Sequence, residues 1–191
     1  MTNILTLLEE PMDPTRLVKV SKYLSKHLRH APERLGLALA PGGWVAVEEL
    51  LAACERHRFP LTRAELDEVV AKSDKKRFAF DESGALIRAN QGHTVGVDLE
   101  LAPAEPPALL YHGTPERNVD AILTMGILKM ARHHVHLSAD TATATKVGAR
   151  RGRPIVLVVD AAQMHRDGLT FLCSANGVWL VDHVPPAYVR R

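Results

Sequence analysis

The chain has 191 residues, of which 46% are hydrophobic, and its 24 Lys and Arg nearly balance its 22 Asp and Glu. This length allows one large domain or two small ones, and the composition supplies a packed core and excludes a disordered chain. The apolar runs are too short to cross a bilayer, so no membrane contact is expected. Two cysteines without metal-ligand spacing, and no sign of a secretory signal, predict a cytoplasmic protein with reduced thiols.

The first helix is expected to begin after Asp13 and to end near His30. Asp13 is followed by a proline, a pattern typical of an N-cap and first helical position, and Ala31-Pro32 ends the helix. Apolar residues fall on one face of this helix. The basic residues of the opposite face are Lys19, Lys22, Lys26 and Arg29. One side is therefore expected to pack, and the other to meet solvent or phosphate.

Two more helices and a hairpin are expected before residue 90. Thr62 and Glu65 form a capping-box pattern, which predicts a helix start. The other expected elements are a short strand at 44–47, a helix at 47–57, and strands at 77–81 and 85–89 joined by a turn. Three helices followed by a hairpin are typical of a winged helix.

The pattern changes after residues 97–107, which carry three prolines and indicate a linker. The elements expected beyond it are strands at 109–111, 135–137, 155–159, 170–172 and 178–181, a helix at 115–125 closed by Gly126, and a short helix at 140–147. The sequence therefore predicts an α+β fold with a domain at 1–96, a linker at 97–107 and a second domain at 108–191 that is built on a small sheet.

Basic residues cluster at 16–34 and 128–153, which suggests a local anionic ligand. Arg29, Arg88 and Arg132 are candidates for that ligand, because several converging guanidinium groups bind a phosphate dianion well. Each is also compatible with an ordinary surface arginine, and the sequence does not show whether they converge. His30 beside Arg29 is equally compatible with a cation at a helix C-terminus.

The segment from Tyr111 to Thr114 is expected to end a strand and open a helix. Free N–H groups at such a helix start, and a glycine that permits close approach, suit the pyrophosphate or ribose of a dinucleotide. A plain strand-to-helix turn explains the segment equally well. The chain has neither the glycine-rich loop of dehydrogenases nor a Walker A sequence.

Histidines at 133, 134 and 136 raise the question of a metal. His134 and His136 alternate by two, which places both on one face of a strand, but no suitable third ligand lies near them. No metal is therefore expected. Hydrogen bonds to neighbouring groups, or to the ribose hydroxyls of a ligand, remain as alternatives.

Several ordered motifs together resemble the Tpt1/KptA family of RNA 2′-phosphotransferases, over about residues 17–188. The matching segments are Leu24-Ser25-Lys26-His27-Leu28-Arg29-His30, Gly43-Trp44-Val45, Ile87-Arg88-Ala89-Asn90-Gln91-Gly92-His93, Tyr111-His112-Gly113-Thr114, Arg132-His133-His134-Val135-His136-Leu137-Ser138 and Asn176-Gly177-Val178-Trp179-Leu180.

This resemblance implies an N-terminal winged-helix lobe for RNA and an ADP-ribosyltransferase-like lobe for NAD. The catalytic set that it implies is Arg29, His30, Arg88 and Arg132. The NAD-binding residues that it implies are His112, Gly113, Thr114, His136, Ser138 and Val178. Val178 stands where protein-modifying relatives carry Glu, which fits a nucleophile that is already an anion and needs no general base.

The activity implied by the resemblance is removal of an internal 2′-phosphate from RNA, with NAD consumed as co-substrate. The 2′-phosphate is ADP-ribosylated, nicotinamide leaves, and the products are RNA with a 2′-hydroxyl and ADP-ribose 1″,2″-cyclic phosphate. The substrate implied is splice-junction tRNA, and a monomer is expected. Three alternatives are an ADP-ribosyltransferase that caps terminal phosphates of RNA or DNA, a non-catalytic RNA-binding module, and a protein-modifying toxin.

Overall fold

The computed structural model describes residues 12–72 and 76–191 of the chain. Over these residues the fold is mixed α+β, with six α-helices and several small antiparallel sheets. The first eleven residues, where no secretory signal was expected, lie outside the described residues. Across the described ranges, no helix is both long and apolar enough to cross a membrane.

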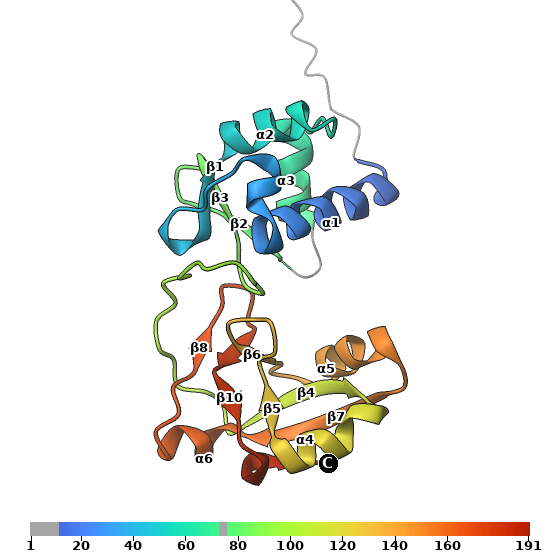
Figure 1. Cartoon of the computed structure of the whole chain (residues 1–191), viewed down its shortest axis with the longest axis vertical. Coiled ribbons are helices and arrows are strands. Elements are labelled where there is room, and N and C mark those ends of the chain that lie inside the picture. Colours follow the sequence, from blue (N-terminus) through green and yellow to red (C-terminus); the bar gives the residue numbers. More distant parts are fainter. Residues whose placement is uncertain (1–11, 73–75) are drawn as a thin grey trace, which may run out of the picture.

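Three helices and one antiparallel sheet form the part of the fold that precedes residue 90 (Figure 1). The elements are α1 (Pro14–His30), β1 (Trp44–Ala46), α2 (Val47–Arg56), α3 (Arg63–Lys72), β2 (Phe78–Phe80) and β3 (Leu86–Ala89), with short 3-10 turns at Pro32–Leu35 and Pro41–Gly43. The strand order is β1-β3-β2. Five elements agree with the sequence predictions to within one or two residues, and α3 begins where the capping-box pattern places a helix start.

Helix α1 forms for the reasons that the sequence indicates. The Asp13 side chain accepts a hydrogen bond from the backbone N–H of Arg16 at 3.0 Å, which caps the helix start. Val20, Leu24 and Leu28 are fully buried on its inner face. The last turn carries Arg29 and His30, so packing of the apolar face holds these two side chains at the end of a rigid element.

The part of the fold that follows residue 108 is built on small antiparallel sheets. Its strands are β4 (Leu109–Pro115), β5 (Ile127–Leu128), β6 (Val135–Leu137), β7 (Pro154–Asp160), β8 (Leu172–Cys173), β9 (Trp179–Val181), β10 (His183–Val184) and β11 (Val189–Arg190). They pair in the orders β11-β7-β4, β6-β9-β8 and β10-β5. The helices are α4 (Val119–Met125), α5 (Thr141–Gly148) and α6 (Ala161–Arg166), and 3-10 turns lie at Glu116–Asn118, Ala149–Arg151 and Pro186–Tyr188.

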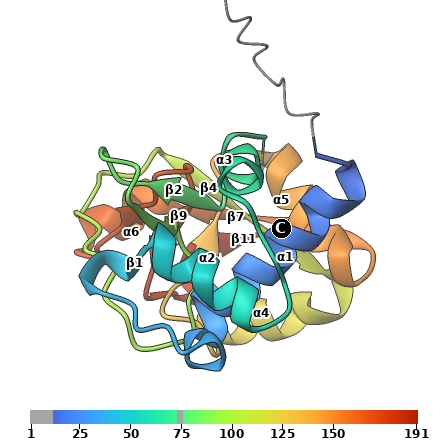
Figure 2. The same cartoon turned by 90° about the horizontal axis from the view of Figure 1, so that it is seen from above.

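Each of the two parts has its own hydrophobic cluster. One draws its buried residues from positions 20–89, and the other from positions 110–189. Residues 90–108 between them contain no helix or strand apart from a single bridge between Pro103 and Leu172. Figures 1 and 2 place α1 on the same side of the molecule as α5.

Two predictions for this second part have the wrong bounds, and several short elements were missed. The helix expected at 115–125 starts as a 3-10 turn at Glu116–Asn118 and continues as α4 from Val119, because β4 extends to Pro115 in its pairing with β7. The strand expected at 170–172 is β8 at Leu172–Cys173. Strands β5, β10 and β11 have two residues each, too few for a visible alternation. Helix α6 was missed because it has only six residues. Its N-cap is an ordinary one, in which the Asp160 side chain accepts a hydrogen bond from the backbone N–H of Gln163.

Candidate active site

Arg29 lies in the last turn of α1 with its guanidinium largely withdrawn from water. Its Nη2 donates a hydrogen bond to the carbonyl oxygen of Arg77 at 3.3 Å, and its Nε is buried with no hydrogen-bond partner among the described residues. Burial, together with the charges of Arg77 and Arg132, lowers the pKa of Arg29 to about 10. The group remains a cation at neutral pH, so it offers a partly desolvated positive charge to an anion.

His30 ends the same helix and is exposed. Its Nδ1 lies 3.0 Å from Oγ1 of Thr94. Burial lowers the pKa of this ring, and the positive charges of Arg29 and Arg132 lower it too. The ring is therefore mainly neutral at pH 7, a state in which one nitrogen can accept a proton.

Arg88 lies on β3, directly opposite Trp44 on β1. Its guanidinium carbon is 4.5 Å from the centroid of the indole, and Nη1 donates to the carbonyl oxygens of Gly42 at 3.2 Å and Leu99 at 3.4 Å. Burial lowers the pKa of Arg88, while Glu100 raises it. The stacked ring and the two carbonyls fix the direction of the guanidinium.

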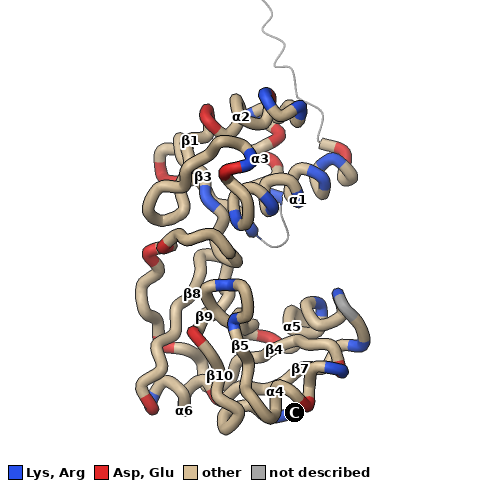
Figure 3. Tube along the Cα trace, viewed as in Figure 1, with Lys and Arg blue, Asp and Glu red and all other residues tan. Residues whose placement is uncertain are grey.

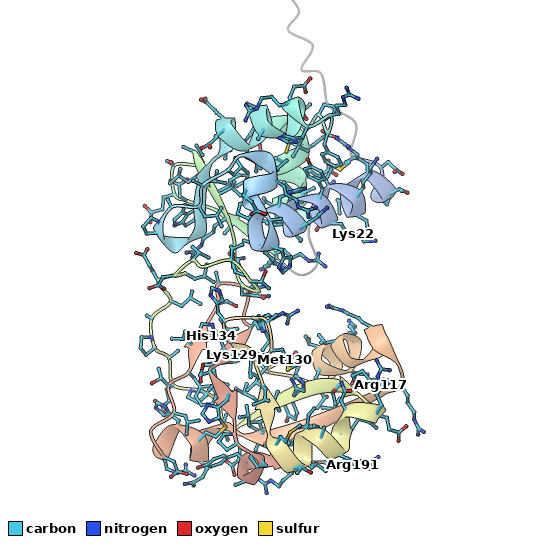
Figure 4. All side chains as sticks on the ribbon, in the orientation of Figure 1. Lys22, Arg117, Lys129, Met130, His134 and Arg191 are labelled. Atoms are coloured by element: carbon cyan, nitrogen blue, oxygen red, sulfur yellow. The ribbon has the colours of Figure 1, made fainter. Side chains whose placement is uncertain are left out.

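Arg132 is exposed on the segment that leads into β6, and its N–H donates to the carbonyl oxygen of Lys129 at 3.1 Å. Figure 4 shows Lys129, Met130 and His134 of this segment. Nη1 of Arg132 lies 3.5 Å from Nδ1 of His136. The charge of Arg132 lowers the pKa of both Arg29 and His30, although these two residues lie on α1 in the first part of the fold. The three groups therefore lie close enough to interact electrostatically.

Two neutral histidines stand beside this charge. Nδ1 of His112 on β4 lies 3.3 Å from the carbonyl oxygen of His136 on β6. Burial lowers the pKa of His112, and burial followed by Arg132 lowers that of His136 to about 3. Nε2 of His136 is buried without a hydrogen-bond partner in the described part of the chain. Tyr111 and Ser138 hold the two strands together by reciprocal backbone bonds of 2.9 and 2.8 Å.

Gly113 and Thr114 lie inside strand β4, so their predicted place at a helix start is wrong. A Cβ atom on Gly113 would lie 1.7 Å from the carbonyl oxygen of Ala144, so the close approach that this glycine permits is that of helix α5. Thr114 is buried, and its Oγ1 accepts a hydrogen bond from Nδ2 of Asn118 at 3.5 Å. The structure thus gives both residues a packing role, independent of any ligand.

Val178 is half-buried in the turn that precedes β9. Its N–H donates to Oγ of Ser174 at 3.2 Å, and its carbonyl oxygen accepts from the Ser174 N–H at 3.0 Å. These hydrogen bonds stay within the turn, so they do not join Val178 to the arginines.

His93 is a residue that the sequence predictions left out of the site. It is 2% exposed, and both ring nitrogens are buried without a hydrogen-bond partner in the ranges that the structure describes. Burial, together with the nearby charges of Arg29 and Arg88, lowers its pKa to about 4. The unexplained polar run before it, Asn90-Gln91-Gly92, was the available signal. His93 lines a small cavity together with Gly92, Leu99, His133, His134, His136 and Leu180.

Positive charge predominates around Arg29 and Arg88. Among the described residues, neither Arg29 nor Arg88 forms an ion pair with a carboxylate, and no group of three or more His, Cys, Asp or Glu is placed to hold a metal ion. Figure 3 shows basic residues along α1 and on the segment between β5 and β6. The three arginines are therefore the candidate binding region for a phosphate group.

Comparison with known proteins agrees with this chemistry. The model of the family described as RNA 2′-phosphotransferase, Tpt1/KptA family, matches residues 15–183. The chain belongs to this family. It is therefore a transferase that acts on RNA 2′-phosphates, and the alternative of a non-catalytic RNA-binding module is set aside.

Relatives match this family member over nearly their whole length. The probable RNA 2′-phosphotransferase of Trichormus variabilis is 63% identical over 179 residues, which cover 94% of this chain and 98% of the relative. That of Nostoc punctiforme is 60% identical, with 94% and 99% covered. That of Streptomyces griseus is 65% identical over 185 residues, with 93% and 98% covered.

Proposed function

We propose that this RNA 2′-phosphotransferase transfers an internal RNA 2′-phosphate to NAD in two steps, through an ADP-ribosylated intermediate. The observation that supports this most is electrostatic proximity: Arg132 lowers the pKa of both Arg29 and His30, and Arg29 and Arg88 both lower the pKa of His93. Arginines bind phosphate oxygens bidentately and supply positive charge without a metal.

We assign RNA to residues 1–96 and NAD to residues 108–191, joined by the segment 97–107. Three helices followed by the β2–β3 hairpin support a winged-helix lobe in the first range. Each range also has its own hydrophobic cluster, as expected of separate lobes. The small sheets that carry His112 and His136 support an ADP-ribosyltransferase-like lobe in the second.

The proposed contacts to NAD come from β4, β6 and the turn before β9. The buried, unpartnered Nε2 of His136 and the neutral ring of His112 suit the ribose hydroxyls of NAD, which both donate and accept hydrogen bonds. The full set proposed for NAD is His112, Gly113, Thr114, His136, Ser138 and Val178. Val178 supplies no base, which is acceptable because the attacking phosphate is already an anion.

In the first step an oxygen of the RNA 2′-phosphate attacks the anomeric carbon of the nicotinamide ribose. The new C–O bond replaces the bond to nicotinamide, which leaves as a neutral base. Arg29, Arg88 and Arg132 hold the phosphate near the developing positive charge of the ribose.

In the second step the adjacent ribose 2″-hydroxyl attacks the phosphorus, and the bond from phosphorus to the RNA 2′-oxygen breaks. The arginines stabilise the added negative charge. Neutral His30 accepts the proton of the 2″-hydroxyl at Nε2 and returns it to the departing 2′-oxygen. The products are RNA with a 2′-hydroxyl and ADP-ribose 1″,2″-cyclic phosphate.

The test uses a short RNA that carries one internal 2′-phosphate and a 5′-terminal phosphate, incubated with the purified protein with and without NAD. Loss of the phosphate only with NAD supports the proposal. A product that keeps ADP-ribose on a terminal phosphate, with internal 2′-phosphates untouched, would instead identify a capping enzyme. Removal that does not need NAD would contradict the proposal.

A further inference from the structure

Thr94 forms two hydrogen bonds with the last two residues of α1. The Thr94 N–H donates to the carbonyl oxygen of Arg29 at 2.9 Å, and Thr94 Oγ1 lies 3.0 Å from Nδ1 of His30. Carbonyl groups in the last turn of a helix lack partners within the helix, so the first bond fixes this helix end. The second bond joins residues 64 positions apart in the sequence.

The bond at Nδ1 decides what the other ring nitrogen can do. A neutral imidazole has one N–H and one lone pair, and a threonine hydroxyl can serve as partner to either. Nε2 can accept a proton only when Nδ1 carries the hydrogen, so in the active tautomer Nδ1–H donates to Oγ1 of Thr94 and the lone pair of Nε2 is left for the reaction. We propose that Thr94 is a positioning residue, which holds the His30 ring so that Nε2 can pass a proton between the ribose 2″-hydroxyl and the RNA 2′-oxygen. This inference rests on the proposed function of His30.

A hydroxyl suits this position better than the carboxylate that orients histidine in the Ser-His-Asp arrangement. A carboxylate would raise the pKa of His30 and attract Arg29 and Arg132, which are needed for the phosphate. Thr94 orients the ring without adding charge. Because Thr94 is exposed and its hydrogen bond lies at the surface, the bond contributes little to folding, and its loss is expected to affect rate instead of stability.

Thr94→Val removes the hydroxyl at nearly constant volume, and Thr94→Ser keeps it. Thr15→Val, at an exposed position in the first turn of α1, is the matched control. We expect Thr94→Val to lower kcat roughly 10-fold, a part of what general acid–base catalysis contributes, with KM for the RNA within about 2-fold. Thr94→Ser is expected to restore the rate, and the control to leave it unchanged. Equal losses in the Ser and Val variants, or a lowered Tm that accounts for the loss, would overturn the proposal.

A double-mutant cycle tests whether Thr94 acts through His30. In a His30→Ala background, Thr94→Val is expected to cause no further loss, because the group it positions is gone. Nitrogen-15 NMR of the His30 ring needs no turnover: the Nδ1–H tautomer is expected to dominate in the unchanged enzyme, and a mixture of tautomers is expected in Thr94→Val. An unchanged tautomer ratio would overturn the inference about Thr94, whether or not the protein has NAD-dependent activity. Absence of NAD-dependent activity would contradict the proposed function only.

Discussion

The backbone of Gly113 in β4 lies so close to α5 that a Cβ atom on Gly113 would be 1.7 Å from the carbonyl oxygen of Ala144. Gly148 meets the same strand from the helix side, where its own Cβ would lie 3.0 Å from the backbone nitrogen of Thr114. The two glycines let α5 rest directly on β4, beside His112. This contact between strand and helix therefore explains why glycine occupies the position between His112 and Thr114.

Gly113→Ala is expected to destabilise the fold. The added methyl group meets backbone atoms, which move only if the whole helix moves, so a loss of about 1–3 kcal/mol or more in the free energy of unfolding follows. Urea unfolding measures it. Gly96→Ala is the control, because a Cβ there meets nothing within 4 Å. Equal stability of the two variants would contradict the described packing.

Arg88→Lys is expected to lower the rate while the fold is retained. Lysine keeps the charge but loses the planar group that stacks on Trp44 and bonds the Gly42 carbonyl, so the phosphate meets a misplaced cation. We expect a loss of roughly 10²–10³ in kcat, the typical cost of one transition-state contact.

The control for that substitution is Arg63→Lys, which changes another arginine over an aromatic ring. The Arg63 guanidinium carbon lies 4.9 Å from the centroid of the Phe80 ring, and Arg63 is not among the predicted site residues. Its rate is expected to stay within about 2-fold of the unchanged enzyme, as for surface substitutions elsewhere. Similar losses in both variants would show that stacking, and not phosphate contact, accounts for the effect.

The free energy of unfolding is expected to fall as the pH drops below about 6.5, partly because of His93. Its pKa is lowered from 6.5 to about 4, so between these values the unfolded chain binds a proton that the folded chain refuses. The unfolded state then holds more protons, and acid favours it. His93→Asn should give a shallower dependence between pH 6.5 and 4 in urea unfolding, whereas the exposed His165→Asn should not. A slope unchanged by His93→Asn would mean that this ring is not held neutral.

Arg132→Ala is expected to slow the second step more than the first. In the second step negative charge builds up on the phosphate, and Arg132 lies beside His136 in the proposed NAD lobe. ADP-ribosylated RNA should therefore accumulate and be visible by gel shift or mass spectrometry. Arg153→Ala removes an exposed arginine paired with Glu116 and serves as the control. Loss of activity without any accumulated intermediate would place Arg132 in substrate binding or in the first step.

Local rules in the sequence were enough to predict the elements that hold much of the site. The Asp13 cap and the apolar face of α1 locate Arg29 and His30 at a helix end, and the β2–β3 hairpin locates Arg88. The same rules failed at Tyr111 to Thr114, where pairing with β7 extends the strand beyond what local propensity indicates.

Long-range contacts could not be predicted from these patterns. The bond from Thr94 to His30 spans 64 positions, and the effect of Arg132 on the pKa of Arg29 spans more than a hundred. Neither leaves a periodic signal. The first depends on how the chain after β3 returns to the end of α1, and the second on how the two hydrophobic clusters are placed relative to one another. The polar run before His93 drew attention to this segment, but it did not indicate that the ring is buried within reach of Arg29 and Arg88.

The most direct test of the proposed reaction follows the phosphate itself. RNA with a single internal 2′-phosphate, labelled with oxygen-18 at its non-bridging oxygens, is incubated with the enzyme and NAD, and the small products are weighed by mass spectrometry. The account predicts ADP-ribose 1″,2″-cyclic phosphate that retains every labelled oxygen, because the ribose carbon bonds to a phosphate oxygen. Labelled inorganic phosphate beside unlabelled ADP-ribose would contradict it.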